Sequence, residues 1–415
     1  MAHFKGVGKS DEKGAEGLVR GGRISHLGPG CAVDKRLETV KQLSFPRRSA
    51  SAEEARAAEY VASRMKQAGI DVTLQPFWAQ HTFSWVFACI YALNLIAPIA
   101  ALYSARYVAL FFGVVSILSF YAESNTREVF ARLVPKFPSK NVIGVIPAAS
   151  QKLGTLIVSA HYDSSRSGLS FHPKMVKGLR TSYILMAISL AVNSVIAVAS
   201  TLSGRPGIAY LAAPTVIYIA FAVLLFVHRE FFGKVTPGAN DNASGVAVLL
   251  EVADRLSAEP PRHTEVWLVA TGAEEAGTVG MIRFLEAYKA SIKGAQVINL
   301  DNLGTGNLKY ITAEGMLHTY RSSPDLLSQA EIVSSENPHL KIAPMEYRAL
   351  TTDSLAAMVR GYPALCVMAF DNEGILPNWH WPTDTWENVD PGNLARASEF
   401  VIKLISSWDA HLLLR

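Results

Sequence analysis

The chain has 415 residues, of which 50% are hydrophobic and 18% are charged. That length exceeds what one hydrophobic core usually fills, and the charged fraction is below that of typical soluble domains, so we expect one large domain with additional elements that contact lipid. The formal net charge is only +4, without a basic stripe interleaved with aromatic residues, which argues against nucleic-acid binding. The three cysteines have no metal-ligand spacing and predict no disulfide framework.

The N-terminal segment, residues 1–37, is polar, charged and rich in glycine, and it predicts a flexible tail without a cleavable secretory signal. The first helix is expected over residues 52–68, where apolar residues have helical spacing. Ser51 and Glu54 at its start resemble a capping box. The folded part of the chain is therefore expected to begin near residue 38.

Four uncharged apolar stretches follow, and each is close to the length that a helix needs to cross a bilayer. They form two pairs with very short connections, which predicts two helical hairpins. The alternatives are hairpins buried in a protein core or an apolar oligomer interface. Asn94 and Asn193 are expected to hydrogen bond across to neighbouring helices. The stretches are 84–104 and 107–122 in the hairpin of residues 82–122, and 182–203 and 208–227 in the hairpin of residues 182–228.

The remaining segments, residues 38–81, 123–181 and 229–415, have the pattern of alternating strands and helices. This pattern predicts an α/β catalytic domain with a mostly parallel mixed sheet flanked by helices. In such sheets the ligand site lies beyond the carboxyl ends of the strands. The expected strands are 141–146, 155–160, 265–271, 296–300 and 364–370, and the expected helices are 243–256, 278–290 and 394–413.

Side chains that bind metals follow several of these strands directly or lie in loops rich in Gly, Asn and Pro. Imidazole and carboxylate ligands without thiolates are typical of a hydrolytic zinc site. Taken singly, His161-Tyr-Asp163 would be a hydrogen-bonded pair at a strand end, and Glu274-Glu275 would be a solvated pair. Their occurrence together is what indicates a site. The candidates are His161, Asp163, Asp241, Glu274, Glu275, Asp301 and His380.

Five motifs in this order resemble the co-catalytic zinc aminopeptidases, the group of aminopeptidase Y and bacterial leucyl aminopeptidases. Relatives of that group are glutamate carboxypeptidase II, the transferrin receptor and glutaminyl cyclase. The resemblance implies the zinc-exopeptidase (phosphorylase/hydrolase-like) fold and covers about residues 38–77, 139–164 and 237–415. The motifs are His161-Tyr-Asp-Ser, Gly238-Ala-Asn-Asp-Asn-Ala-Ser-Gly, Glu274-Glu-Ala-Gly, Asn299-Leu-Asp301 and His380-Trp-Pro-Thr-Asp-Thr.

The resemblance also implies two Zn²⁺ ions and a role for each candidate. His161 and Asp301 would hold one ion, Glu275 and His380 the other, and Asp241 would bridge both. Glu274 would be the general base, and Asp163 would orient His161. In the family a cis peptide follows the bridging aspartate, which makes Asp241-Asn242 a candidate for that geometry. Imidazole and carboxylate ligands suit other divalent ions as well.

The chain departs from the family pattern because the two apolar hairpins interrupt it. We expect them to make the chain an integral, multi-pass membrane protein that seats the catalytic domain on the bilayer with its cleft near the surface. Positive residues near membrane spans tend to stay cytoplasmic, so the catalytic domain is expected on the cytoplasmic side. The hairpin tips carry Arg106 and Arg205, whereas the ends that join the catalytic domain carry Arg127, Arg132, Lys136, Lys174, Lys177, Arg180, Arg229 and Lys234.

Three further residues are candidates for binding substrate. Asp353 lies where the family often has Ser-Asp-His, although Ser354 replaces the histidine. Trp379 and Trp381 flank His380 and are candidates for the wall of a hydrophobic specificity pocket.

The motifs together predict a membrane-embedded zinc exopeptidase, specifically an aminopeptidase acting on the N-terminus of a peptide or protein. One alternative is a glutaminyl cyclase-like acyltransferase, which the segment Trp386-Glu-Asn-Val-Asp resembles. Another is a receptor or scaffold without catalysis. Neither the residue that is cleaved nor the oligomeric state follows from the sequence.

Overall fold

A computed structural model describes residues 34–414. Helix α1 (Lys35–Leu43) begins directly after Asp34, whose side chain accepts a hydrogen bond from the backbone N–H of Arg36. An aspartate in this position satisfies an N–H group that the first helical turn leaves without a partner. Residues 35–37 are therefore helical although they were predicted as tail. Residues 1–33 of the predicted tail lie outside the described residues.

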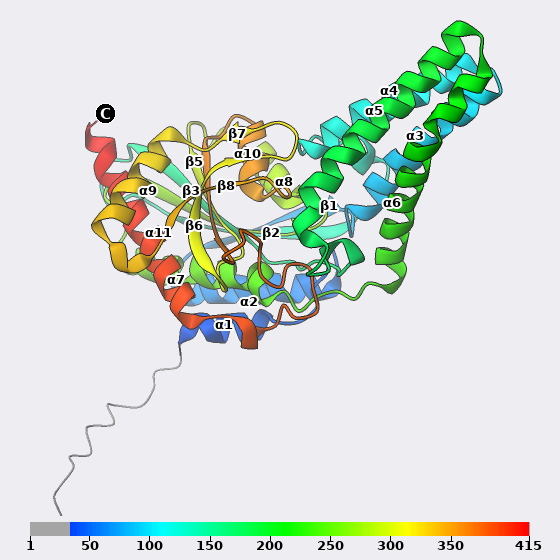
Figure 1. Cartoon of the computed structure of the whole chain (residues 1–415). Coiled ribbons are helices and arrows are strands. Elements are labelled where there is room, and N and C mark those ends of the chain that lie inside the picture. Colours follow the sequence, from blue (N-terminus) through cyan, green and yellow to red (C-terminus); the bar gives the residue numbers. More distant parts are fainter. Residues whose placement is uncertain (1–33, 415) are drawn as a thin grey trace, which may run out of the picture. The chain divides into compact units, whose positions relative to one another are not determined.

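A nine-stranded mixed sheet forms the centre of the catalytic domain, in the order β1-β2-β4-β3-β5-β9-β6-β7, with β8 beside β6 (Figure 1). The central strands β4, β3, β5 and β9 are parallel, whereas β1, β2 and β6 add antiparallel pairings on either side. The strands are β1 (Val72–Ala79), β2 (Phe137–Ile146), β3 (Gly154–His161), β4 (Thr264–Thr271), β5 (Gln296–Leu300), β6 (Asn307–Glu314), β7 (Tyr320–Arg321), β8 (Ala343–Tyr347) and β9 (Ala364–Phe370).

All five predicted strands are present, and the prediction of a mixed sheet flanked by helices is confirmed. The four strands that were not predicted lie outside the central parallel part. β1 contains Pro76 and β8 contains Pro344, and a proline in a strand is tolerated mainly at sheet edges. Both strands are also largely exposed, so neither has the apolar run that marks a buried strand.

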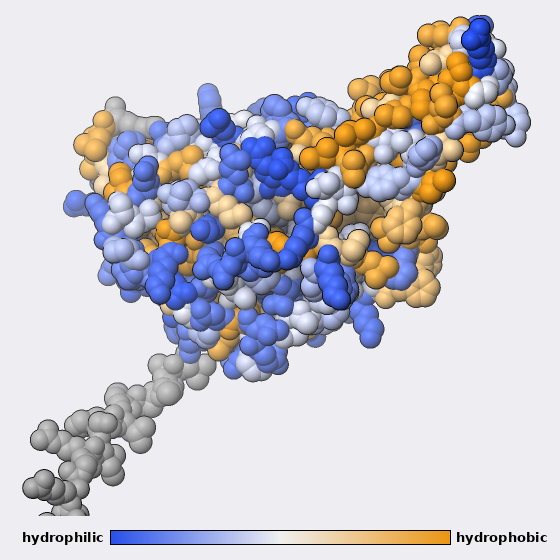
Figure 2. All heavy atoms as spheres, viewed as in Figure 1, coloured by the Kyte–Doolittle hydropathy of each residue, from blue (hydrophilic) through white to orange (hydrophobic). Residues whose placement is uncertain are grey.

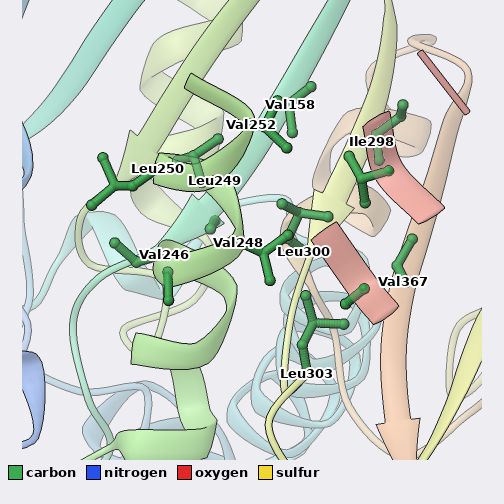
Figure 3. Packing of buried hydrophobic residues seen from close by; sticks show 14 of the residues in the cluster. Val158, Val246, Val248, Leu249, Leu250, Val252, Ile298, Leu300, Leu303 and Val367 are labelled. Carbon is green, nitrogen blue, oxygen red and sulfur yellow. The ribbon is translucent and has the colours of Figure 1, made fainter. Parts of the chain in front are cut away.

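Helices cover both faces of this sheet. Side chains alternate along β3, so Val158 packs on one face with α7 while Ile157 packs on the other with α8. Figure 3 shows α7 packed against the strands through Val248 and Leu300. The helices are α2 (Ala52–Gln67), α7 (Ser244–Ala258), α8 (Val279–Ala287), α9 (Pro324–Glu336), α10 (Asp353–Val359) and α11 (Pro391–His411).

Four long helices extend together from one end of the sheet (Figure 1). They are α3 (Ser84–Leu102), α4 (Arg106–Ser124), α5 (Leu179–Ser203) and α6 (Ala213–Phe232), which form the two predicted hairpins. The second hairpin is longer than predicted, and a 3-10 helix occupies Pro206–Ala212 before α6 begins. Other short 3-10 helices are Phe130–Arg132, Leu169–Phe171, Val176–Gly178, Pro338–Leu340, Trp386–Asn388 and Leu412–Leu414.

The interior of this helical bundle is polar at its centre. The Asn94 side chain of α3 donates hydrogen bonds to Ser116 of α4 at 2.8 Å and to Ser194 of α5 at 3.2 Å. Asn193 donates to Asn94 at 3.2 Å and accepts from Thr215 of α6. All four helices are thus joined by one hydrogen-bonded network, which confirms the prediction for Asn94 and Asn193.

The outer faces of the bundle are apolar, the reverse of the arrangement in a soluble bundle. Leu118 is 63% exposed and Ile217 is 70% exposed. The same distribution is visible in Figure 2, where the projecting helices are mostly hydrophobic and the sheet domain is mostly hydrophilic. Within the described residues, four helices are long and apolar enough to cross a membrane. These helices are therefore not buried in the core of this chain.

Candidate metal centre

The sheet brings three of the predicted metal ligands to one edge. His161 ends β3, Glu275 follows β4 and Asp301 follows β5. These strands are parallel neighbours, so their carboxyl ends meet. Asp241 comes from the turn before α7, and His380 comes from the loop after β9. The five residues are all buried.

The ligand atoms form two groups that share Asp241. One group is His161, Asp241 and Asp301, and the other is Asp241, Glu275 and His380. The two carboxylate oxygens of Asp241 divide between them. Oδ1 lies 3.2 Å from His161 Nε2, and Oδ2 lies 3.2 Å from His380 Nε2. His161 Nε2 is also 3.6 Å from Asp301 Oδ1, and His380 Nε2 is 3.1 Å from Glu275 Oε1.

This donor set fits a pair of divalent cations. Carboxylates outnumber imidazoles, and buried negative charge of this kind requires a compensating cation. Burial raises the pKa of Asp241, but hydrogen bonds from His161 and His380 outweigh it and hold that pKa well below its usual value. Burial lowers the pKa of His380, whereas the carboxylates of Glu275 and Asp241 raise it to about 9. The site therefore favours positive charge on both sides of Asp241.

Glu274 is the carboxylate beside the cluster that belongs to neither ligand group. Its Oε2 atom lies 4.0 Å from His161 Nε2. Burial raises the pKa of Glu274 well above its usual value, and the neighbouring Glu275 carboxylate adds to this shift, which His161 opposes. Two adjacent glutamates thus have different environments, because Glu275 faces His380 and Glu274 faces His161.

Asp163 binds the loop that carries these glutamates. Its two oxygens accept hydrogen bonds from the backbone N–H groups of Glu274 and Glu275, both at 3.1 Å. Ser49 donates a third hydrogen bond at 2.6 Å. Asp163 Oδ1 also lies 3.4 Å from His161 Nδ1, the position expected of a residue that orients the imidazole. The contact with the glutamate loop was not predicted.

The loops that carry the ligands have unusual backbone conformations. Ala273 (φ 52°), Asn302 (φ 54°) and His380 (φ 48°) are left-handed although none is glycine. Such conformations cost on the order of 1–3 kcal/mol each and cluster at functional sites, where the surrounding structure imposes them. The Asp241–Asn242 peptide bond is cis, as the family resemblance implied.

Two buried residues that were not predicted hold the turn around Asp241. Asp384 accepts hydrogen bonds from the backbone N–H groups of Asn240 at 2.6 Å and Asp241 at 3.1 Å. Burial, together with the Asp241 carboxylate, raises the pKa of Asp384 to about 7. The Arg47 guanidinium donates to the carbonyl oxygens of Tyr162 and Gly238, which are 115 and 191 residues away in sequence. Asp384 lies in the quoted motif that begins at His380, whereas no sequence pattern connects Arg47 with the site.

Glu54 is a third such residue. Ser51 caps α2 by accepting the Glu54 N–H at 3.2 Å, which is half of the predicted capping box. The Glu54 carboxylate instead accepts hydrogen bonds from the N–H groups of Ala50 and Ala273, both within 2.9 Å. Because Ala273 precedes Glu274, the Glu54 carboxylate holds the start of the glutamate loop. The sequence pattern thus predicted a local cap, whereas the Glu54 carboxylate makes a long-range contact with Ala273.

Arg229 joins the helical hairpins to the loop that follows His161. It lies near the end of α6 and donates to the carbonyl oxygen of Arg166 at 3.1 Å. Because its guanidinium is buried and bonded, it contributes no free surface charge at the end of this helix. The same guanidinium donates to the side-chain hydroxyls of Thr82, Ser84 and Ser165.

The three candidate substrate-binding residues lie in different places. A cavity of about 170 Å³ contains the metal-binding residues, and Trp379 lines it. Asp353 is fully buried, accepts a hydrogen bond from Thr271 and does not line this cavity. Trp381 also lies outside its lining and packs edge-on against His172. Of the three, the structure thus brings Trp379 to the site.

The fold and the buried cluster of candidate metal ligands resemble those of metallopeptidases, and comparison with known proteins agrees. Residues 221–405 match Peptidase family M28. Aminopeptidase YwaD of Bacillus subtilis is 28% identical over 182 residues, which cover 40% of this chain and 36% of YwaD. Residues 221–405 thus resemble peptidase family M28, and the resemblance to zinc aminopeptidases is confirmed. The alignment spans less than half the length of this curated relative.

Solved structures share the fold over most of the chain. BSAP, a zinc aminopeptidase from Bacillus subtilis, has a TM-score of 0.53 at 16% identity and covers 89% of this chain and 93% of its own. The glutaminyl cyclase of Bacteroides thetaiotaomicron has a TM-score of 0.55 at 17% identity, covering 91% and 98%. The fold is thus common to peptidases and a cyclase, and it does not separate these two chemistries.

Proposed function

We propose that this protein is a zinc-dependent aminopeptidase that is anchored in a membrane by its two helical hairpins. The observation that carries the proposal is the position of Asp241, which has one carboxylate oxygen next to His161 and the other next to His380. A carboxylate in that position joins two ligand groups into one centre. Sites with two such ions occur in aminopeptidases and in several other classes of hydrolytic enzyme.

In this proposal His161, Asp241 and Asp301 would hold one zinc ion, and Asp241, Glu275 and His380 would hold a second. When bound, zinc lowers the pKa of water and polarises a carbonyl group. Glu274 accepts the proton of the attacking water and donates it to the leaving amine, because it lies outside both ligand groups and, unlike Asp163, lines the cavity. Burial raises the pKa of Glu274, so the site makes this carboxylate a better proton acceptor than an exposed glutamate.

Asp163 acts as a positioning residue in this mechanism. It holds the backbone of Glu274 and Glu275 through two hydrogen bonds and lies against His161. One carboxylate therefore fixes the position of the base relative to a ligand of each ion. Catalytic groups need this support because small displacements from the productive geometry cost large factors in rate.

The first test separates the proposed aminopeptidase from its alternatives. Zinc-loaded protein in detergent is expected to release the N-terminal residue of a free peptide and to leave the N-acetylated peptide intact. A chelator should abolish the release and added zinc should restore it, because the ligands hold the ions required for the reaction. Mass spectrometry of the products checks both expectations.

Other outcomes of this experiment contradict the proposal in distinct ways. Conversion of an N-terminal glutamine to pyroglutamate without hydrolysis would show a cyclase, whose fold this chain shares. Release of carboxyl-terminal residues would show the opposite exopeptidase. Absence of any reaction, in protein that binds no zinc, would favour a receptor or scaffold.

We propose further that the four apolar helices span a bilayer and leave the catalytic domain on the cytoplasmic side. Their exposed apolar faces and the hydrogen-bonded polar centre support membrane insertion. The charges at the domain ends of the hairpins support the orientation. Among these charges Arg229 is buried in hydrogen bonds, so the argument rests on the others.

Cysteine labelling tests this orientation. In a cysteine-free background, Arg205→Cys at the exposed tip of the second hairpin is expected to react with a membrane-impermeant maleimide in intact cells. Glu336→Cys, on the exposed face of α9, should react only after the membrane is opened. The reverse pattern would place the catalytic domain outside the cytoplasm. Extraction of the protein by alkaline carbonate would contradict membrane insertion itself.

A further inference from the structure

All four helices of the bundle meet the catalytic domain at one end, because both hairpins begin and end there (Figure 1). α3 and α5 begin at this end, and α4 and α6 finish at it. The four junctions surround the base of the bundle, and together we call them the junction collar. The collar consists of residues 78–85 at the start of α3, 123–137 at the end of α4, 168–180 at the start of α5 and 228–235 at the end of α6.

Every junction of the collar exposes large apolar side chains. Leu133, after α4, is 75% exposed, and Phe232, at the end of α6, is 73% exposed. Removing such groups from water is favourable, and the interface of a bilayer provides this burial and is enriched in tryptophan. The collar thus has the side chains of a membrane interface. Its other exposed apolar residues are Trp78, Trp85, Val129, Phe137, Leu169, Met175 and Phe231.

This apolar surface continues the outer face of the bundle. Ile217, Phe221 and Leu224 of α6 are exposed, and their spacing of four and three residues places them on one face of the helix. Phe231 follows seven residues later on the same face and contacts Trp85 of α3 edge-to-face, with 6.2 Å between the ring centroids. The stripe therefore runs from the proposed membrane span to the collar, where it joins both hairpins.

The acidic side chains of the collar already have partners. Glu128 pairs with Arg283 at 2.6 Å. Glu230 lies 3.7 Å from the Nε atom of Arg166. Glu123 accepts hydrogen bonds from two backbone N–H groups, at 2.7 and 2.9 Å. All three glutamates are at least partly buried, so the surface of the collar carries little negative charge.

The exposed charged residues of the collar, in contrast, are all positive. Lys177 pairs with Glu373 at 2.5 Å. The other five form no ion pair within residues 34–414, and they come from three of the four junctions. Their charge is therefore free for an anionic partner. They are Arg127, Arg132, Lys174, Arg180 and Lys234.

We propose that the junction collar binds the headgroups of anionic phospholipids in the membrane that the hairpins span. The exposed apolar side chains enter the interface, and the lysine and arginine side chains beside them bind lipid phosphates. A soluble anion matches the charges but leaves the apolar side chains in water, whereas an anionic bilayer matches both. The cytoplasmic leaflet is the anionic one, which agrees with the proposed orientation. The proposal rests on the membrane insertion proposed above and not on the peptidase activity.

The test measures which lipids contact the full-length chain after reconstitution into phosphatidylcholine vesicles. EPR spectroscopy distinguishes spin-labelled lipid that is immobilised at the protein from lipid in the bulk bilayer. We expect phosphatidylglycerol to contact the protein about two- to fivefold more often than phosphatidylcholine. A basic residue near the surface contributes about fivefold at its own position, and lipid elsewhere around the bundle lowers the average. High salt should reduce this preference, because it screens exposed charges.

Two triple variants with the same change in charge locate the binding surface. The first combines Arg132→Gln, Lys174→Gln and Lys234→Gln, one at each of three junctions, and should lower the ratio by at least about twofold. The control should keep the wild-type ratio. It changes three exposed residues ahead of β1, β4 and β5, at the edge of the sheet opposite the metal centre. The control combines Lys66→Gln, Arg262→Gln and Lys293→Gln.

Equal ratios for the two triple variants would overturn the proposal, as would a wild-type ratio of one. Inorganic phosphate at constant ionic strength should leave the wild-type preference unchanged, and loss of the preference would assign the basic residues to a soluble anion. In these cases membrane insertion would stand. Absence of an immobilised component for either lipid would overturn membrane insertion together with this proposal.

Discussion

Glu274→Gln is expected to lower kcat by about 10²- to 10⁴-fold while the zinc content of the protein stays that of the wild type. Glutamine has nearly the same shape as glutamate but cannot accept the proton of the attacking water. Glu274 lies outside both ligand groups, so its replacement leaves the ions in place. Activity assays together with metal analysis by mass spectrometry measure the two quantities on one preparation.

The adjacent glutamate provides the contrast for this experiment. Glu275 faces His380 at 3.1 Å and belongs to a ligand group, so Glu275→Gln should lower zinc content as well as activity. Loss of zinc in Glu274→Gln would show that Glu274 is a ligand. Full activity of Glu274→Gln would assign the base to another residue.

Asp241→Ala is expected to prevent binding of both zinc ions. Without Asp241 each ligand group keeps only two residues, fewer than the three protein ligands that a catalytic zinc site normally has. Asp301→Ala should remove one ligand from its group, leaving only His161 and Asp241 there, and leave the group of Asp241, Glu275 and His380 complete. Titration with zinc by calorimetry should therefore give about two, one and no ions for wild type, Asp301→Ala and Asp241→Ala.

The graded result distinguishes a bridged centre from two separate sites. If Asp241→Ala kept one ion, Asp241 would be a ligand of a single ion. The position of its two oxygens between His161 and His380 would then not indicate a bridge between two ions. Asp384 offers a control, because Asp384→Asn changes a carboxylate that holds the Asp241 backbone without belonging to a ligand group. That variant should weaken zinc binding without changing the number of ions.

The sequence alone determined the types of residue at the site and their approximate places. His161 ends one apolar strand, Asp301 follows another directly, and the two glutamates come shortly after a third, and an apolar run with a polar end is a local pattern. The hairpins could also be predicted from the sequence, because an apolar run long enough to cross a membrane is recognised from its own residues alone. Asn94 and Asn193 were notable for a similar reason, since an amide in such a run requires a hydrogen-bonding neighbour.

Tertiary structure alone decided how these residues are supported and what surrounds them. The hydrogen bonds of Arg47 and Asp384 to the turn before α7 join residues more than a hundred positions apart, and no local pattern records such pairs. Edge strands such as β1 are largely exposed and lack an apolar run, so the sequence pattern of a buried strand does not identify them. Burial and direction of side chains depend on packing between distant segments, and packing exists only in the folded chain.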